Sequence, residues 1–490
     1  MTEDAIESAK LSLYAFQLSH DMESGEWQRT RDSQDLWETI AQLGKDLHIP
    51  VLPKLSTFLN LEENLPETAK FQPLLSDEID NCLRLPFPNS DLNPPFLDRK
   101  IDLYAAQIHD TYVVDLTIHH FKPVTIEHLS YLNPDGKLLA HKMQASLGQT
   151  LVLFVKPQNN PAPEEYRDLS DRSLETLLSS ANFNLEYPSY LNEGKLLGSP
   201  IFEYDNFAKD PSQSCHILIW LCVSPETLSL EARVDDDSYY YPLIEVLCYR
   251  SKIVFSYWQA CDRYREARKI YQELDQRSRD LTNLPVDREK RLDNLKKSLV
   301  EMNPQDFTYA SYIRDIEDHL TSIKTNLHNY IKSLQVLEQV PGENDLTNFR
   351  DFRKTSNYYV LQMKTYLNYL MPGKELFGHS IATMRGIVEI EQAEINNKRQ
   401  QQETDLQHEI QAIGIGITVG TTFAASSGLM TQSWEWGKQK KIESFTQLFH
   451  PFWMVVFGSL GMAIAAFFLF RYLLKRKRKR SRKIRRSHLP

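Results

Sequence analysis

The chain has 490 residues and a formal net charge of −9, and it is long enough for several domains. Its last twenty residues carry eleven Lys or Arg and no acid, so the preceding 470 residues carry −20, a balance that argues against general nucleic-acid binding. The five cysteines form no Cys-x-x-Cys pair, which disfavours a thiol metal site and fits reduced, mostly buried thiols in a cytoplasm.

Residues 1–75 are expected to form an N-terminal helical segment. Ala5–Leu13 and Asp35–Leu47 alternate polar and apolar residues at helical spacing. The first residues show no basic region followed by an apolar core, so we expect no export signal and a body that stays in the cytoplasm. The Pro-rich passage Leu85–Phe96 follows, and because Pro removes backbone donors it predicts a loop or a domain seam.

Residues 76–255 are expected to form a mixed α/β domain. Tyr112–Ile118, Thr150–Val155 and His216–Val223 are short runs of β-branched and other apolar residues. Runs of about 4–8 such residues bounded by turn formers are typical of strands. Ser170–Ser180 lies between two of them and has a helical pattern.

Two groups in this domain contain residue types that bind metals. The three consecutive carboxylates Asp235–Asp237 can bind hard cations, but the Ser and Tyr residues that follow more often mark a solvated turn. His119, His120 and His128 lie near acidic residues, yet adjacent side chains on a strand point to opposite faces, which argues against a shared metal. The metal ligands therefore stay unassigned. The sequence has no Walker loop, no His-Glu-x-x-His and no Gly-x-Ser-x-Gly, so nothing in it favours an enzyme.

Residues 256–409 are expected to form a helical stalk. Nine apolar or aromatic residues alternate in steps of four and three, which predicts the heptad seam of a coiled coil: Tyr309, Ile313, Ile316, Leu320, Ile323, Leu327, Tyr330, Leu334 and Leu337. Val340–Gly342 should end this helix, and Met371–Gly373 should interrupt the next one. No Gly or Pro lies between Val388 and Ala412, so the last stalk helix should continue into the apolar segment that follows.

The C-terminal part predicts a two-helix transmembrane hairpin. Residues 410–430 form transmembrane helix 1, residues 431–450 an outer loop, residues 451–474 transmembrane helix 2 and residues 475–490 a basic tail. Lys and Arg beside a span stay on the cytoplasmic side. With the body also cytoplasmic, the number of spans must be even. We therefore expect a multi-pass protein of the inner or plasma membrane whose first partner is the lipid bilayer.

The first span has two faces at about 100° per residue. Polar or small residues share one face and are candidates to line a pore, because hydroxyls and an amide can replace waters around a cation: Gln411, Gly414, Thr418, Thr421, Thr422, Ala425 and Gly428. The alternative is close helix packing. Gly416, Gly420, Ala424 and Gly428 recur every four residues, a spacing that lets helices approach closely. The two interpretations are compatible in an oligomer.

The order of these elements resembles the CorA family of magnesium channels, in architecture and over roughly residues 100–490. That family carries Gly-Met-Asn at the outer end of the first span, where the ion entrance of the pentamer lies. The corresponding place here reads Ser427-Gly-Leu-Met430, so Gly428 can match the Gly but no Asn follows. The resemblance implies a homo-oligomer, a pentamer if CorA-like, with Mg²⁺ or another divalent cation as substrate or regulator.

Two hypotheses follow. The first is a metal cation channel or transporter with a cytoplasmic regulatory domain, and the polar face of the first span favours it. The second is a non-transporting membrane-anchored scaffold or sensor that binds partners through its α/β domain and coiled coil. The missing Asn favours the second hypothesis.

Overall fold

The computed structural model describes residues 5–21, 28–61, 71–75, 81–86, 99–179, 186–233, 238–280, 284–427 and 451–486. The chain divides into two compact units, residues 1–280 with 302–378 and residues 281–301 with 379–490. Asp235–Asp237, Gly428, the predicted outer loop and most of the Pro-rich passage lie outside the described residues.

The described residues of the first unit contain a mixed ten-stranded sheet. Its main path runs β10-β11-β12-β9-β1-β7-β6-β4, with β5 paired to β6 and β8 paired to β1. The β9–β12 pair is parallel and the other pairs are antiparallel. The strands are β1 (Ala5–Leu18), β4 (Gln72–Pro73), β5 (Cys82–Pro86), β6 (Arg99–Ile108), β7 (Thr111–His120), β8 (Val124–Thr125), β9 (Gly148–Pro157), β10 (Ser189–Leu196), β11 (Ser199–Asp205) and β12 (His216–Leu221); β2 (His20–Asp21) and β3 (Gln28–Arg29) form a separate pair. The three strand predictions are confirmed.

The helices are short within the sheet domain and long after it. The short ones are α1 (Asp35–Asp46), η2 (Leu52–Thr57), η4 (Ile126–Leu132), η5 (Pro134–Gly136), α2 (Ala140–Met143), η6 (Pro163–Glu165), α3 (Tyr166–Ser179), η7 (Pro211–Gln213) and α4 (Pro225–Glu231). The long ones are α5 (Tyr240–Asp280), α6 (Arg288–Gln339), α7 (Thr347–Ser427) and α8 (Pro451–Arg486). The helices predicted at Asp35–Leu47 and Ser170–Ser180 are confirmed as α1 and α3.

The helix predicted over Ala5–Leu13 is wrong, because this segment is the central strand β1. It pairs with β7 on one side and β9 on the other along almost its whole length. Its Ala, Lys, Glu and Leu residues favour helix locally, but the two strand partners and burial on both faces override that preference. The N-terminal segment therefore contributes to the same sheet as residues 76–255.

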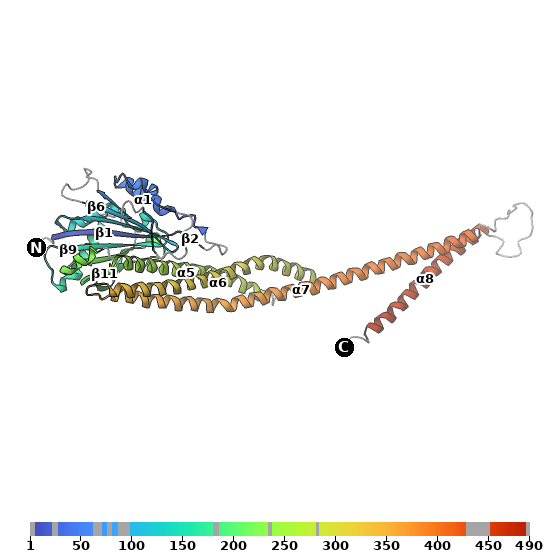
Figure 1. The fold of residues 1–490 in the computed structure, drawn as a ribbon. Coiled ribbons are helices and arrows are strands. Elements are labelled where there is room, and N and C mark those ends of the chain that lie inside the picture. Colours follow the sequence, from blue (N-terminus) through green and yellow to red (C-terminus); the bar gives the residue numbers. More distant parts are fainter. Residues whose placement is uncertain are drawn as a thin grey trace, which may run out of the picture. The chain divides into compact units, whose positions relative to one another are not determined.

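The two faces of the sheet differ in chemistry. Leu11 and Leu13 of β1 point into the main hydrophobic core, where they join residues of α1 and α3 such as Trp37 and Leu177. The intervening residues of β1 point to the opposite face, because successive side chains of a strand alternate. Helix α5 contacts β1 and β9, and Figure 1 shows it on the side of the sheet away from α1.

In the first unit, the long helices pack through the predicted seam and through aromatic pairs. All nine predicted seam residues of α6 are buried. Tyr257 and Tyr264 of α5 stack on Tyr359 and Tyr366 of α7, each pair with ring centroids 3.8 Å apart. Helix α6 ends at Gln339, before Val340–Gly342 as predicted.

The interruption predicted at Met371–Gly373 is wrong, because Pro372 lies inside the uninterrupted helix α7. Neighbouring helices hold this turn. The Tyr309 hydroxyl donates to the Leu370 carbonyl at 2.7 Å. A Cβ at Gly373 would lie only 2.7 Å from the Tyr271 ring, so the glycine lets an aromatic side chain cover the turn.

A buried charged cluster joins Arg250 of α5 to side chains of β9, β11 and β12. The Arg250 guanidinium donates to Asp205, and its Nε lies 3.7 Å from Glu203 Oε1. His216 Nε2 lies 3.0 Å from the same Glu203 oxygen, and its Nδ1 lies 2.7 Å from the Thr150 hydroxyl. A neutral imidazole with its proton on Nε2 satisfies both contacts, donating to Glu203 and accepting from Thr150.

The protonation of His216 predicts how the stability of this domain depends on pH. Burial, with the nearby Arg250 charge, lowers the pKa of His216, so the unfolded chain takes up the proton more readily than the folded chain. The free energy of unfolding should therefore fall as the pH falls through the ordinary His pKa of about 6.5, by at most ~1.4 kcal/mol per pH unit. We expect His216→Gln to remove this part of the slope in urea titrations between about pH 8 and pH 5. Equal slopes in the two proteins would contradict the assignment.

Candidate functional site

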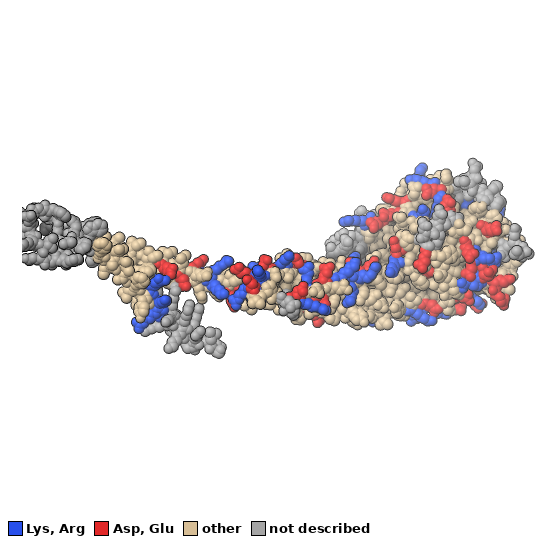
Figure 2. All heavy atoms as spheres, turned by 180° about the vertical axis from the view of Figure 1, so that it is seen from behind, with Lys and Arg blue, Asp and Glu red and all other residues tan. Residues whose placement is uncertain are grey.

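Helix α8 contains an apolar section. Within the described residues, Val455–Leu473 is the one helical segment that is long and apolar enough to cross a membrane, and none of its residues is fully buried. Residues 410–427 of α7 and 451–470 of α8 contain no charged residue. In Figure 2 the blue and red side chains of Lys, Arg, Asp and Glu follow α7 and stop before its C-terminal section, which is tan. The predicted first span, residues 410–430, extends beyond the described residues of α7. A membrane crossing by α7 therefore stays a prediction.

The glycines of α7 that were predicted to pack helices face α8. A Cβ at Gly416 would lie 3.1 Å from the Ala463 carbonyl oxygen, and one at Gly420 would lie 3.0 Å from the Ala463 Cβ. Glu409 and Arg471, at the ends of the two uncharged sections, lie 3.7 Å apart. The two helices therefore run in opposite directions here, and Gly residues permit their close approach. Ala424 lies one turn beyond Gly420 in the same helix.

The candidate pore-lining residues of α7 lie on the side away from α8. We call this side the hydroxyl face, and its described members are all exposed: Gln411, Gly414, Thr418, Thr421, Thr422 and Ala425. A Cβ at Gly414 would meet no atom within 4 Å. The hydroxyls of Thr418 and Thr422 donate to carbonyls one turn back in their own helix, at 2.8 and 2.7 Å. Their remaining lone pairs can accept from water or contact a cation.

No group of three His, Cys, Asp or Glu side chains that could hold a metal ion occurs in the part of the chain that the structure describes. His119 pairs with Asp102 at 2.9 Å, and His128 accepts from or donates to the Thr125 hydroxyl at 2.8 Å. His120 follows His119 in β7 and is buried. The three histidines thus have separate surroundings.

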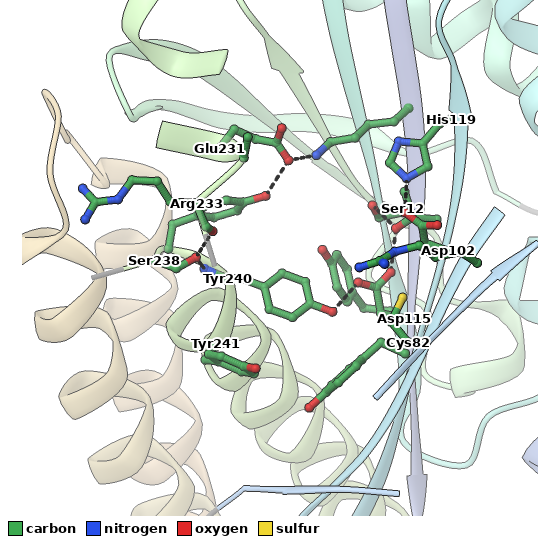
Figure 3. A pocket seen from close by; sticks show the side chains of 17 residues that line it. Ser12, Cys82, Asp102, Asp115, His119, Glu231, Arg233, Ser238, Tyr240 and Tyr241 are labelled. Carbon is green, nitrogen blue, oxygen red and sulfur yellow. Dashed lines mark hydrogen bonds and ion pairs between the residues drawn. The ribbon is translucent and has the colours of Figure 1, made fainter. Parts of the chain in front are cut away.

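A second site was not predicted: a cavity of about 290 Å³ between the sheet and the start of α5. We call it the tyrosine pocket (Figure 3). Its lining comes from β1, β5, β6, β7, the end of α4 and the first turn of α5, and consists of Lys10, Ser12, Tyr14, Cys82, Arg84, Asp102, Tyr104, Asp115, Thr117, His119, Glu231, Ala232, Arg233, Ser238, Tyr239, Tyr240 and Tyr241. The strand register brings these residues together, since Tyr14 lies opposite Asp115 and Asp115 opposite Tyr104.

The tyrosine pocket has hydrogen-bonded walls. The Thr117 and Tyr240 hydroxyls donate to the two oxygens of Asp115 at 2.7 and 2.6 Å. Lys10 forms an ion pair with Glu231. Burial lowers the pKa of Lys10 to about 8 and raises the pKa of Asp115 above its ordinary value. Both shifts have the same main cause, which is the loss of solvent around a charged group.

A sequence signal for the tyrosine pocket existed in β1. Lys10, Ser12 and Tyr14 alternate with Leu11 and Leu13, which is the period of a strand with one polar face. Because this segment was predicted to be a helix, the alternation was not interpreted as the polar face of a strand.

No known family model matches this sequence, and no curated protein matches it. The functional assignment therefore depends on the residues and contacts described above.

Proposed function

We propose that the chain is one subunit of a homo-oligomeric, CorA-like membrane protein that conducts metal cations. In this proposal α7 and α8 form a transmembrane hairpin, the sheet domain and the tail lie in the cytoplasm, and the substrate is Mg²⁺ or another divalent cation. Two spans per chain cannot enclose a pore, so conduction requires a ring of subunits, a pentamer if it follows the family.

One observation carries the proposal: the hydroxyl face of α7 is exposed while the opposite side of the helix packs on α8. Among the described residues, the packing and pore-lining interpretations of the first span thus use different residues of the same helix. The Thr hydroxyls already donate within their own helix, so in a bilayer the Gln411 amide and the remaining hydroxyl lone pairs are the groups that water would satisfy. In a ring of subunits with this face turned to a common axis, the face would line a water-filled pore. The hydroxyls could then substitute for part of a cation's hydration shell.

A membrane-anchored scaffold is the second candidate function. The specific observation for it is the sequence Gly428-Leu-Met430, which lacks the Asn found in the family's motif. In such a protein the hydroxyl face would serve subunit contact or a partner span, and no ion would pass.

The subunit count distinguishes the two functions. Native mass spectrometry of the full chain in a mild detergent should give a single ring-forming species, a pentamer in the CorA-like case. A monomer or dimer that persists across several detergents would leave no pore to line and would favour the scaffold.

Flux through the hydroxyl face provides a direct test of conduction. Gln411→Leu and Thr418→Leu should each remove most of the Mg²⁺ flux into liposomes that contain the purified protein, because each replaces a polar ligand on the pore side with a branched apolar side chain. Ile413→Leu is the matched control, since Ile413 is exposed but lies outside the hydroxyl face. Unchanged flux in both polar variants would rule out this face as the ion path.

A further inference from the structure

The tyrosine pocket encloses a buried carboxylate. Asp115 is only 6% exposed, and its two oxygens accept from the neutral hydroxyls of Thr117 and Tyr240. Among the described residues, no Lys, Arg or His forms an ion pair with it. Figure 3 shows Asp115 on the sheet side of the pocket, with the Tyr240 hydroxyl reaching it from α5.

A carboxylate in this position has unused capacity. An ionised carboxylate can accept about four hydrogen bonds, and Asp115 uses two of them. Burying a charge without an opposite charge is costly, so a cation that entered the pocket would gain a direct ion pair. The two basic groups whose charge acts on Asp115, Lys10 and His119, lie beyond ion-pair distance of it, and each is paired with another carboxylate, Glu231 and Asp102.

Aromatic rings surround this carboxylate. Tyr14 and Tyr104 flank Asp115 on the neighbouring strands at the same register, and both are buried. The Tyr240 ring lies across from the sheet, with its centroid 6.0 Å from that of Tyr104. Faces of aromatic rings attract cations, and ammonium ligands are recognised by cages of such rings.

We propose that the tyrosine pocket binds a small molecule that carries a protonated amine, with the ammonium group paired to Asp115 among the rings of Tyr14, Tyr104 and Tyr240. A volume of about 290 Å³ suits a ligand of amino-acid size.

Calorimetric titration of the purified full chain with three matched probes tests this proposal. Phenethylamine carries only the amine, phenylalanine carries an amine and a carboxylate, and 3-phenylpropionate carries only the carboxylate. At least one of the two amines should bind, and 3-phenylpropionate should not. Binding of 3-phenylpropionate as tight as that of the amines, or no binding of either amine at millimolar concentration, would overturn the proposal.

Variants locate the binding. Asp115→Asn should weaken amine binding by about tenfold or more, because the amide cannot supply the opposite charge. Asp168→Asn is the control, since Asp168 is an exposed carboxylate of α3 outside the pocket. If Asp115→Asn does not fold, Tyr240→Ala carries the test: it should weaken binding by removing a ring, whereas Tyr240→Phe should retain it. Amine affinity that is the same in all folded variants would overturn the assignment. The assignment would also be overturned if Mg²⁺, titrated in place of the amine, bound and its binding were lost in Asp115→Asn. The titration needs no membrane flux, so its outcome is independent of the proposed channel.

Discussion

Arg250→Met is expected to lower the free energy of unfolding by roughly 3–5 kcal/mol. Arg250 is 4% exposed, and the buried carboxylates of Asp205 and Glu203 lie beside its guanidinium. Methionine fills much of the volume but leaves both carboxylates without their cation. The measurement is a urea titration of the detergent-solubilised chain, followed by tryptophan fluorescence.

Two further variants separate this electrostatic cause from a packing defect. Adding Asp205→Asn to Arg250→Met should restore part of the lost stability, since it removes one uncompensated charge and keeps an oxygen for the Phe207 backbone N–H, now at 2.9 Å. Arg350→Met removes an exposed arginine with two surface ion pairs and should cost less than about 1 kcal/mol. If Arg250→Met lowers the free energy of unfolding no more than Arg350→Met does, the stability of the buried cluster does not depend on its cation.

The elements that could be predicted from the sequence are those in which the spacing of apolar residues matches the faces that are buried in the fold. After their polar first residues, Thr150–Val155 and His216–Leu221 are continuous apolar runs, and both are strands buried on their two faces. The seam of α6 follows the same logic, because one helix face repeats every three or four residues regardless of distant partners. The tertiary context decided the other cases. β1 carries helix-forming residues but has two strand partners, and Pro372 lies in a helix that aromatic side chains of α5 and α6 cover.

The candidate sites show the same division. Which residues of α7 share a side could be predicted from sequence alone, since helical spacing fixes it, while a role of one side in lining a pore stays a prediction. The tyrosine pocket could not, because its lining comes from segments as distant as Lys10, Asp115 and Tyr240. Only the strand register, which aligns Tyr14, Asp115 and Tyr104, brings them together.

Gly420→Leu is expected to separate α7 from α8 and to abolish Mg²⁺ flux together with the oligomer. Even a methyl group at this position would lie 3.0 Å from the Ala463 Cβ and 3.4 Å from the Ser459 carbonyl oxygen, so a leucine side chain has no room. The distance between spin labels on noncanonical residues at positions 409 and 471 reports the separation, and native mass spectrometry reports the oligomer.

Gly414→Leu is the matched variant, because it makes the same substitution in the same uncharged section of α7 at a position with open space. It should leave the 409–471 distance unchanged. In the proposed channel it should still block flux, because the leucine would project from the hydroxyl face into the ion path. Three outcomes then have distinct meanings. Loss of flux in both variants with the helices apart only in Gly420→Leu supports separate packing and conduction sides. Normal flux in Gly414→Leu removes the hydroxyl face from the pore. An unchanged label distance in Gly420→Leu contradicts the assignment of Gly420 to the contact with α8, whatever the flux.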